Sequence, residues 1–213
     1  MPTLLHLDSS ADLTGSVSRA LSARFAANWI AMGADHLVIR RDLHSDPLPH
    51  LPTNALHWAH DLRTSSEVVS PEAAALQDRL IQEVINADTV VVGAPMYNWS
   101  VPSTLKAWID YLHVPGVTSP FAEQTQAFVG KPIVLISSRG DRYGPDTDNV
   151  DLQIPVLEQV FGRALGMQVF LVVVELTLAE RIPAMAPLRP QAADSLDVAR
   201  ATIDRLAKEL GAA

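Results

Sequence analysis

The chain has 213 residues, of which 48% are hydrophobic and 19% are charged, so a disordered chain is excluded and a core of ordinary domain size is expected. It contains no cysteine, which excludes disulfide scaffolds, thiolate metal sites and cysteine nucleophiles. The 16 Lys and Arg residues against 24 Asp and Glu give a net charge of −8, which argues against a nucleic-acid partner.

The sequence has no apolar stretch long enough to span a bilayer, and its longest buried-looking run, Met167 to Val174, has the length of a strand. The first residues lack a cationic segment and reach Asp8 after only a few apolar side chains, unlike a secretory signal. We therefore expect a cytoplasmic protein with no membrane partner.

Apolar segments of strand length alternate with helical patterns along the chain. The strand-like segments are residues 3–7, 36–40, 88–93, 131–138 and 167–174. Apolar residues at three- and four-residue spacing predict helices over residues 18–32, 70–86, from 102 onward, 152–165 and 190–210. The pattern predicts an α/β fold with a doubly wound, five-stranded parallel sheet, helices on both faces, and a single domain over residues 1–213.

Three loops of unusual composition follow predicted strands, at residues 9–18, 94–102 and 137–144. In an open parallel sheet, ligands bind beyond the carboxyl ends of the strands. Because these loops leave the same edge of the sheet, we expect them to form one pocket.

The first loop reads SSADLTGSVS and ends where the first helix begins. Its hydroxyl groups and the free amides of a helix N-terminus suit an anion, and the absence of Lys and Arg from the loop indicates a phosphate in a neutral cradle. Walker A and GxGxxG sequences are absent, which argues against an NTPase and a standard dinucleotide site. On this loop alone, the alternative that Ser16 or Ser18 is simply an N-cap is as well supported as the phosphate site.

The second loop reads APMYNWSVP. Met96, Tyr97 and Trp99 would form an apolar and aromatic wall for a flat conjugated ligand, and Asn98 would supply hydrogen bonds. The alternative is that the aromatic side chains pack in the core.

The third loop reads SSRGDRYG. Its main-chain N–H groups near Gly140, with Arg139 or Arg142, would stabilise negative charge on a bound ring. The alternative, a solvated polar turn, is the better interpretation of any one of these residues taken alone.

Together, the segments SSADLTGSVS, PMYNWSVPSTLKAWIDYL and SSRG resemble those of the FMN-dependent NADH:azoreductases, a family of flavodoxin-like quinone reductases, in order and spacing. The resemblance covers nearly the whole chain, and its middle segment is the most specific. It implies a flavodoxin-like fold with strand order 2-1-3-4-5, non-covalently bound FMN, and a homodimer whose substrate pocket lies at the subunit interface.

The same resemblance assigns residues to the cofactor. The phosphate of FMN would be held by Ser10, Ser16, Val17 and Ser18. The ribityl chain and the ring would be contacted by Met96, Tyr97, Asn98 and Trp99. The pyrimidine edge of the ring would be lined by Ser138, Arg139, Gly140 and Asp141.

Two positions depart from the family pattern. Asp141 stands where the family often has a second glycine, and its carboxylate would oppose negative charge on the ring unless it points away or pairs with Arg142. Trp99 stands where many relatives have Phe, which keeps an aromatic surface but changes its shape.

The activity implied is the transfer of two electrons from NADH or NADPH to quinones and, with reductive cleavage, to azo compounds. The cycle would be ping-pong, because donor and acceptor would share one pocket in turn. No side chain is assigned as catalytic, since the flavin performs the chemistry. The alternative is a flavodoxin-type electron carrier that needs a separate reductase.

A few further residues require interpretation. Phe121 lies in a long insertion, and because long loops are often lids we expect it to line the substrate pocket together with Tyr143. His57 and His60 are better explained as a surface pair than as metal ligands, since no third ligand is identifiable, so no metal is expected.

Overall fold

The computed structural model describes residues 1–120, 127–144 and 147–212. Its centre is a five-stranded parallel sheet in the order β2-β1-β3-β4-β5, which confirms the predicted fold class and strand order. Each strand begins and ends within two residues of its predicted bounds. The strands are β1 (Thr3–Asp8), β2 (Leu37–Asp42), β3 (Thr89–Pro95), β4 (Pro132–Ser138) and β5 (Gln168–Val174).

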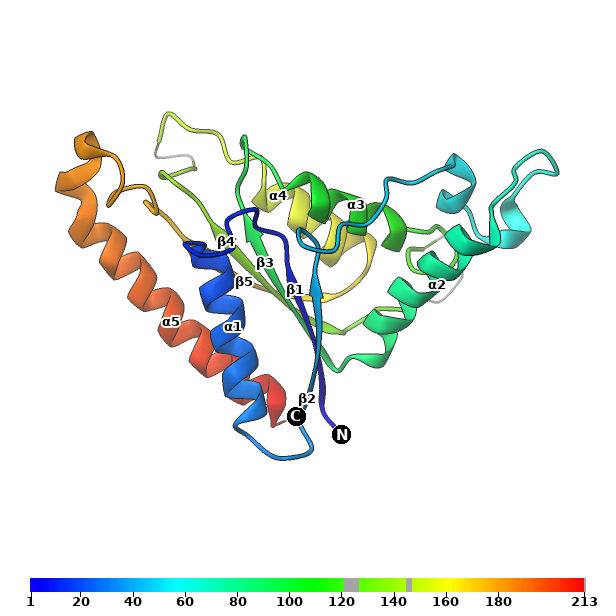
Figure 1. Ribbon diagram of the computed structural model, residues 1–213, viewed down its shortest axis with the longest axis horizontal. Coiled ribbons are helices and arrows are strands. Elements are labelled where there is room, and N and C mark those ends of the chain that lie inside the picture. The colour runs from blue at the N-terminus through cyan, green and yellow to red at the C-terminus, as the bar shows by residue number, and fades with distance from the viewer. Residues whose placement is uncertain (121–126, 145–146, 213) are drawn as a thin grey trace.

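Helices cover both faces of this sheet (Figure 1). The first and last helices pack together on one face, and the others lie on the opposite face. They are α1 (Val17–Ile30), α2 (Pro71–Asn86), α3 (Ser103–Leu112), α4 (Ile154–Leu157) and α5 (Arg189–Gly211). The helix predicted at 152–165 begins as α4 and widens into π-helical turns over Glu158–Ala164. No helix among the described residues is both long enough and apolar enough to cross a membrane.

The central strand β3 is buried along its whole length, as its unbroken apolar sequence predicts. Successive side chains point to opposite faces, so Val90 and Val92 pack into the core under α2 and α3 while Val91 packs against α1 and α5. The carboxyl ends of the strands lie at the upper edge in Figure 1, where the loops of interest emerge.

One residue of β3 is a glycine beside which the carboxylate of Asp8, on the neighbouring strand, lies very close. A Cβ atom on Gly93 would lie 2.9 Å from Oδ1 of Asp8 and 3.4 Å from the main-chain oxygen of Ser18. The first is closer than real Cβ contacts allow. Glycine at this position therefore leaves room for the Asp8 carboxylate between the end of β3 and the start of α1.

Replacing Gly93 with Ala is expected to lower the free energy of unfolding by about 1–3 kcal/mol, because the new methyl group must displace Asp8 or the start of α1. Gly162→Ala is the matched control, since its Cβ would meet only Val169 at an ordinary 3.5 Å inside a helical segment. That control should change stability by less than about 1 kcal/mol, in the stabilising direction. Denaturant unfolding of the two variants measures the difference; equal effects would contradict the close approach.

Candidate functional site

The loop after β1 is organised by side chains that bond to its own main chain. Asp12 accepts hydrogen bonds from the main-chain N–H groups of Thr14 (3.0 Å) and Gly15 (2.8 Å). Chiefly these bonds, and in smaller part the charge of Arg181, hold the pKa of Asp12 below its ordinary value. Ser10 exchanges a 3.1 Å hydrogen bond with the hydroxyl of Tyr97, which ties this loop to the loop after β3.

The N-terminus of α1 leaves main-chain donors free at the end of this loop. Ser16 is the N-cap, and its hydroxyl accepts from the N–H of Arg19 at 3.3 Å. Among the described residues, the N–H groups of Val17 and Ser18 have no acceptor. The Ser18 hydroxyl lies 3.1 Å from that of Ser16, although Ser18 itself is buried. Ser16 is thus an N-cap that still leaves a site for an anion.

A cluster of charges lies beneath this helix start. Arg19 forms a bidentate ion pair with Asp42 at the end of β2, and its guanidinium also donates to the carbonyl of Ser10 at 2.6 and 3.1 Å. This pairing is the main cause that holds the pKa of Asp42 well below its ordinary range. Asp8 lies 3.7 Å from Arg19 and 3.2 Å from the buried His6. The guanidinium of Arg19 is therefore already paired with protein groups, and it holds the loop instead of binding a ligand.

The loop after β3 makes a tight hairpin turn. Tyr97 and Ser100 exchange two main-chain hydrogen bonds of 2.9 and 3.1 Å, and the residues between them, Asn98 and Trp99, have φ of +49° and +66°. Two successive left-handed residues define the turn type that normally takes glycine, and a bulky side chain there is strained. Trp99 is 55% exposed, so its ring lies at the surface beside this turn and not in the core.

A buried glutamine fixes the position of this loop. The amide of Gln153 donates to the carbonyls of Ala94 and Pro95, both at 3.0 Å, and its oxygen accepts from the hydroxyl of Ser137 at 2.7 Å. Gln153 is fully buried, so these bonds are not shared with solvent. They hold the ends of β3 and β4 in register just below the loops.

The loop after β4 is tied to the end of β5. Arg139 is 5% exposed, and its guanidinium pairs with Asp151, lies 3.5 Å from Glu175 and sits 5.6 Å from the ring centre of Tyr143. Burial tends to raise the pKa of Asp151, but the N–H of Ile154 and the Arg139 charge outweigh it, so that pKa is lowered.

The residue after Arg139 is a glycine, and the segment that follows β5 runs close past it. A Cβ atom on Gly140 would lie 2.5 Å from the Leu178 side chain. The segment after β5 is joined to this loop by main-chain bonds, from Thr177 N–H to the carbonyl of Arg139 and from Leu178 N–H to that of Gly140. The loops after β4 and β5 are thus one continuous wall.

A pocket of about 330 Å³ opens where these loops meet. Its lining comes from the loops after β1, β3, β4 and β5, as expected of the carboxyl edge of a parallel sheet. The lining residues are Ser10, Asp12, Gly15, Ser16, Val17, Pro95, Met96, Tyr97, Ser138, Gly140, Thr177, Leu178 and Arg181.

The family model described as "flavodoxin-like fold" matches residues 2–202. A relative from Kineococcus radiotolerans named FMN-dependent NADH:quinone oxidoreductase is 47% identical over 99% of this chain and 100% of its own length. One of the same name from Streptomyces coelicolor is 40% identical over 99% of this chain and 96% of its own.

This chain belongs to the flavodoxin-like family of the FMN-dependent NADH:quinone oxidoreductases. Solved structures agree on the fold. An azoreductase from Bacillus anthracis superposes with a TM-score of 0.78 at 21% identity, over 98% of this chain and 100% of the other. A second azoreductase from that species, solved in complex with FMN, gives 0.77 at 20% identity, over 99% and 100%.

The residues predicted for the site of this flavodoxin-like protein fall into two groups. Seven of them line the pocket together: Ser10, Ser16, Val17, Met96, Tyr97, Ser138 and Gly140. The others lie beside it. Ser18 is buried under the helix start, and Asn98 and Trp99 form the adjacent turn. Arg139 turns its side chain to Asp151 and away from the pocket lining.

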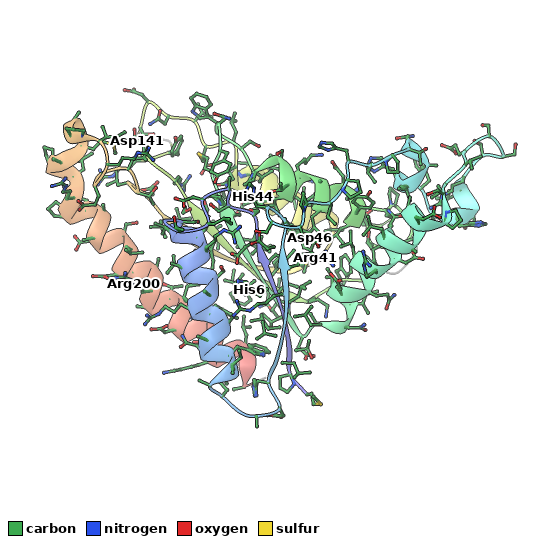
Figure 2. All side chains as sticks on the ribbon, viewed as in Figure 1. His6, Arg41, His44, Asp46, Asp141 and Arg200 are labelled. Carbon is green, nitrogen blue, oxygen red and sulfur yellow. The ribbon has the colours of Figure 1, made fainter. Side chains whose placement is uncertain are left out.

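Two further predictions concern the loop after β4. Asp141, labelled in Figure 2, is exposed and outside the pocket lining; it accepts from the N–H of Arg142 at 2.8 Å. Its other oxygen accepts from the side-chain amide of Asn149 at 3.4 Å, so neither partner is the Arg142 guanidinium. Tyr143 packs against Arg139 and does not line the pocket. Phe121 lies outside the described residues.

Sequence reasoning does not single out six of the lining residues, and three of the six come from the segment after β5. Thr177, Leu178 and Arg181 follow a strand whose exit has no distinctive composition. Among the described residues, no group of three or more His, Asp or Glu side chains is arranged to hold a metal. His57 and His60 lie in two separate short 3-10 turns rather than on one helix.

The three hydrogen bonds by which Gln153 joins the ends of β3 and β4, here called the Gln153 clamp, can be tested directly. Gln153→Leu keeps the side-chain volume but removes the partners of two carbonyls and of the Ser137 hydroxyl. We expect a loss of about 3 kcal/mol in unfolding free energy, since each buried group left unpaired costs about 1–3 kcal/mol. The control, Gln159→Leu, alters an exposed position and should stay within about 0.5 kcal/mol of the parent. Chemical denaturation compares them, and a neutral Gln153→Leu would show that the clamp contributes nothing.

Proposed function

We propose that this chain is an FMN-dependent oxidoreductase that passes two electrons from NADH or NADPH to quinones and reductively cleaves azo compounds. The observation that carries the proposal is the pocket at the strand ends, with unpaired N–H groups of α1 on one side and the loops after β3 and β4 on the other. The names of its relatives, FMN-dependent NADH:quinone oxidoreductase, point to the same chemistry.

The donor groups in the pocket fit FMN. A phosphate monoester would be received by the N–H groups of Val17 and Ser18 and the hydroxyls of Ser10, Ser16 and Ser18. The loop Met96, Tyr97, Asn98 and Trp99 would contact the ribityl chain and the ring. The main chain of Ser138, Arg139, Gly140 and Asp141 would follow the pyrimidine edge.

When bound, FMN supplies the hydride and electron chemistry, which the side chains of this chain do not provide. The protein's own task is to bind and orient. Gln153 and Arg139 fix the main chain of the loops after β3 and β4, so that the N–H group of Gly140 would meet the ring edge without reorganising. The strained turn at Trp99 keeps an aromatic surface exposed beside the pocket for flat donors and acceptors.

A ping-pong order of turnover is part of the proposal. The donor and the acceptor would use one pocket over the flavin in turn. The oxidised donor would leave before the acceptor arrives. The cytoplasm, which holds the pool of reduced nicotinamide, is the proposed place of action.

A homodimer is also proposed. Exposed apolar side chains gather in the loops after β3 and β4 and at the start of α4, and a second subunit would cover them. They are Trp99, Val150, Leu152 and Val156. Sedimentation velocity is expected to give twice the mass of the single chain, and Leu152→Glu should shift the population towards the monomer. A monomeric parent protein at micromolar concentration would contradict the dimer.

The cofactor and the enzyme class are tested together. The purified protein should take up added FMN with quenching of flavin fluorescence, and NADH alone should then bleach the visible flavin absorbance under anaerobic conditions. Adding a quinone or an azo dye should restore the colour. The rival function, an electron carrier, predicts bound flavin that NADH reduces only in the presence of a separate reductase. A protein that fails to bind FMN would overturn both.

A further inference from the structure

The phosphate end of the pocket carries one charge of each sign. Among the lining residues that the structure describes, Arg181 alone is cationic and Asp12 alone is anionic. The sequence suggested a neutral cradle, because the loop after β1 has neither Lys nor Arg. The cation, Arg181, lies far along the sequence from that loop, on the segment that follows β5.

The backbone that carries Arg181 is well fixed. Its own N–H donates to the carbonyl of Leu178 at 2.9 Å, in a turn whose preceding residues are bonded to Arg139 and Gly140. The side chain is exposed, and within the described part of the chain no carboxylate pairs with it. Arg181 is thus held beside the pocket with its charge available.

The other arginines near the start of α1 are engaged. Arg19 is bound to Asp42, Arg24 to Asp204 at 2.6 Å and Arg200 to Asp197 at 3.0 Å. Further along, Arg189 pairs with Glu180 at 3.0 Å. A dianionic ligand in this pocket would draw little from these paired charges.

The carboxylate of Asp12 opposes the binding of a phosphate in this pocket, so a cation is needed to offset it. Its carboxylate occupies the N–H groups of Thr14 and Gly15 and lines the same pocket, so it repels any phosphate brought to the start of α1. A phosphate monoester carries about −1.5 to −2 charges at neutral pH. Hydroxyls and main-chain amides alone would have to bind that charge against a carboxylate.

We infer that Arg181 is a cofactor-binding residue that pairs with the phosphate monoester of FMN and offsets the carboxylate of Asp12. The inference rests on the proposed function, since it names the group that this site binds. In this inference Arg181 contacts the phosphate of FMN and not its ring. Replacing Arg181 must therefore change the binding of FMN but not that of a flavin without a phosphate.

The test compares FMN with riboflavin, which lacks the phosphate. In Arg181→Gln the dissociation constant of FMN, measured by fluorescence quenching at low salt, should rise about tenfold, as expected for loss of one charge-assisted contact. The value for riboflavin should stay within about twofold of the parent's. Arg181→Lys should recover part of the loss, and added salt should shrink the difference. Arg205→Gln is the control, because it removes the same charge from the exposed surface of α5, where Arg205 pairs with Glu209.

Asp12→Asn should change the affinity for FMN in the opposite direction. The amide oxygen keeps an acceptor for the Thr14 and Gly15 N–H groups but removes the charge, so FMN should bind several-fold more tightly and riboflavin unchanged. Equal losses for FMN and riboflavin in Arg181→Gln would overturn the inference, as would an effect confined to the Michaelis constant of NADH. Failure of the parent protein to bind FMN would instead overturn the proposed function itself.

Discussion

The start of α1 has to lie against the ends of β1 and β3 with its first N–H groups unpaired, and the rest of the site depends on this. Gly93 leaves room for the Asp8 carboxylate there, because a Cβ atom at this position would lie 2.9 Å from it. Arg19 maintains the position of the helix start by bridging Asp42 on the edge strand to the carbonyl of Ser10. The fold thus delivers a positive dipole end to a fixed point without exposing a free cation in the loop itself.

The opposite side of the pocket is built from buried polar groups rather than apolar packing. Gln153 joins the ends of β3 and β4, and Arg139 joins the loop after β4 to Asp151 and Glu175. Such networks are costly when incomplete, so they favour one arrangement of the loops over others. If FMN binds as proposed, main-chain N–H groups would face a rigid ring, and a single loop arrangement would let them do so without reorganising.

Much of this was predictable from the sequence, since apolar periodicity is a local signal. All five strands and the five helices appear where the pattern indicates, and seven of the predicted site residues line the pocket. Ser16 shows why one alternative could not be decided locally: capping uses its hydroxyl on Arg19 and leaves the next two N–H groups free, so both interpretations hold. The role of Gln153 is not predictable in this way, because the two carbonyls that it binds lie 58 and 59 residues away in the sequence.

The charge of the pocket was not predictable for the same reason, since it also depends on residues far apart in the sequence. A loop without Lys or Arg looks neutral when its own residues are counted, yet Asp12 makes it negative and Arg181 compensates from a segment well over a hundred positions later. Sequence order carries no trace of that pairing, because the parallel sheet alone brings the loops after β1 and β5 to one edge. A cation supplied by a different loop also links the binding of a phosphate to the packing of the segment after β5 on Gly140, so the two ends of the chain close the site together.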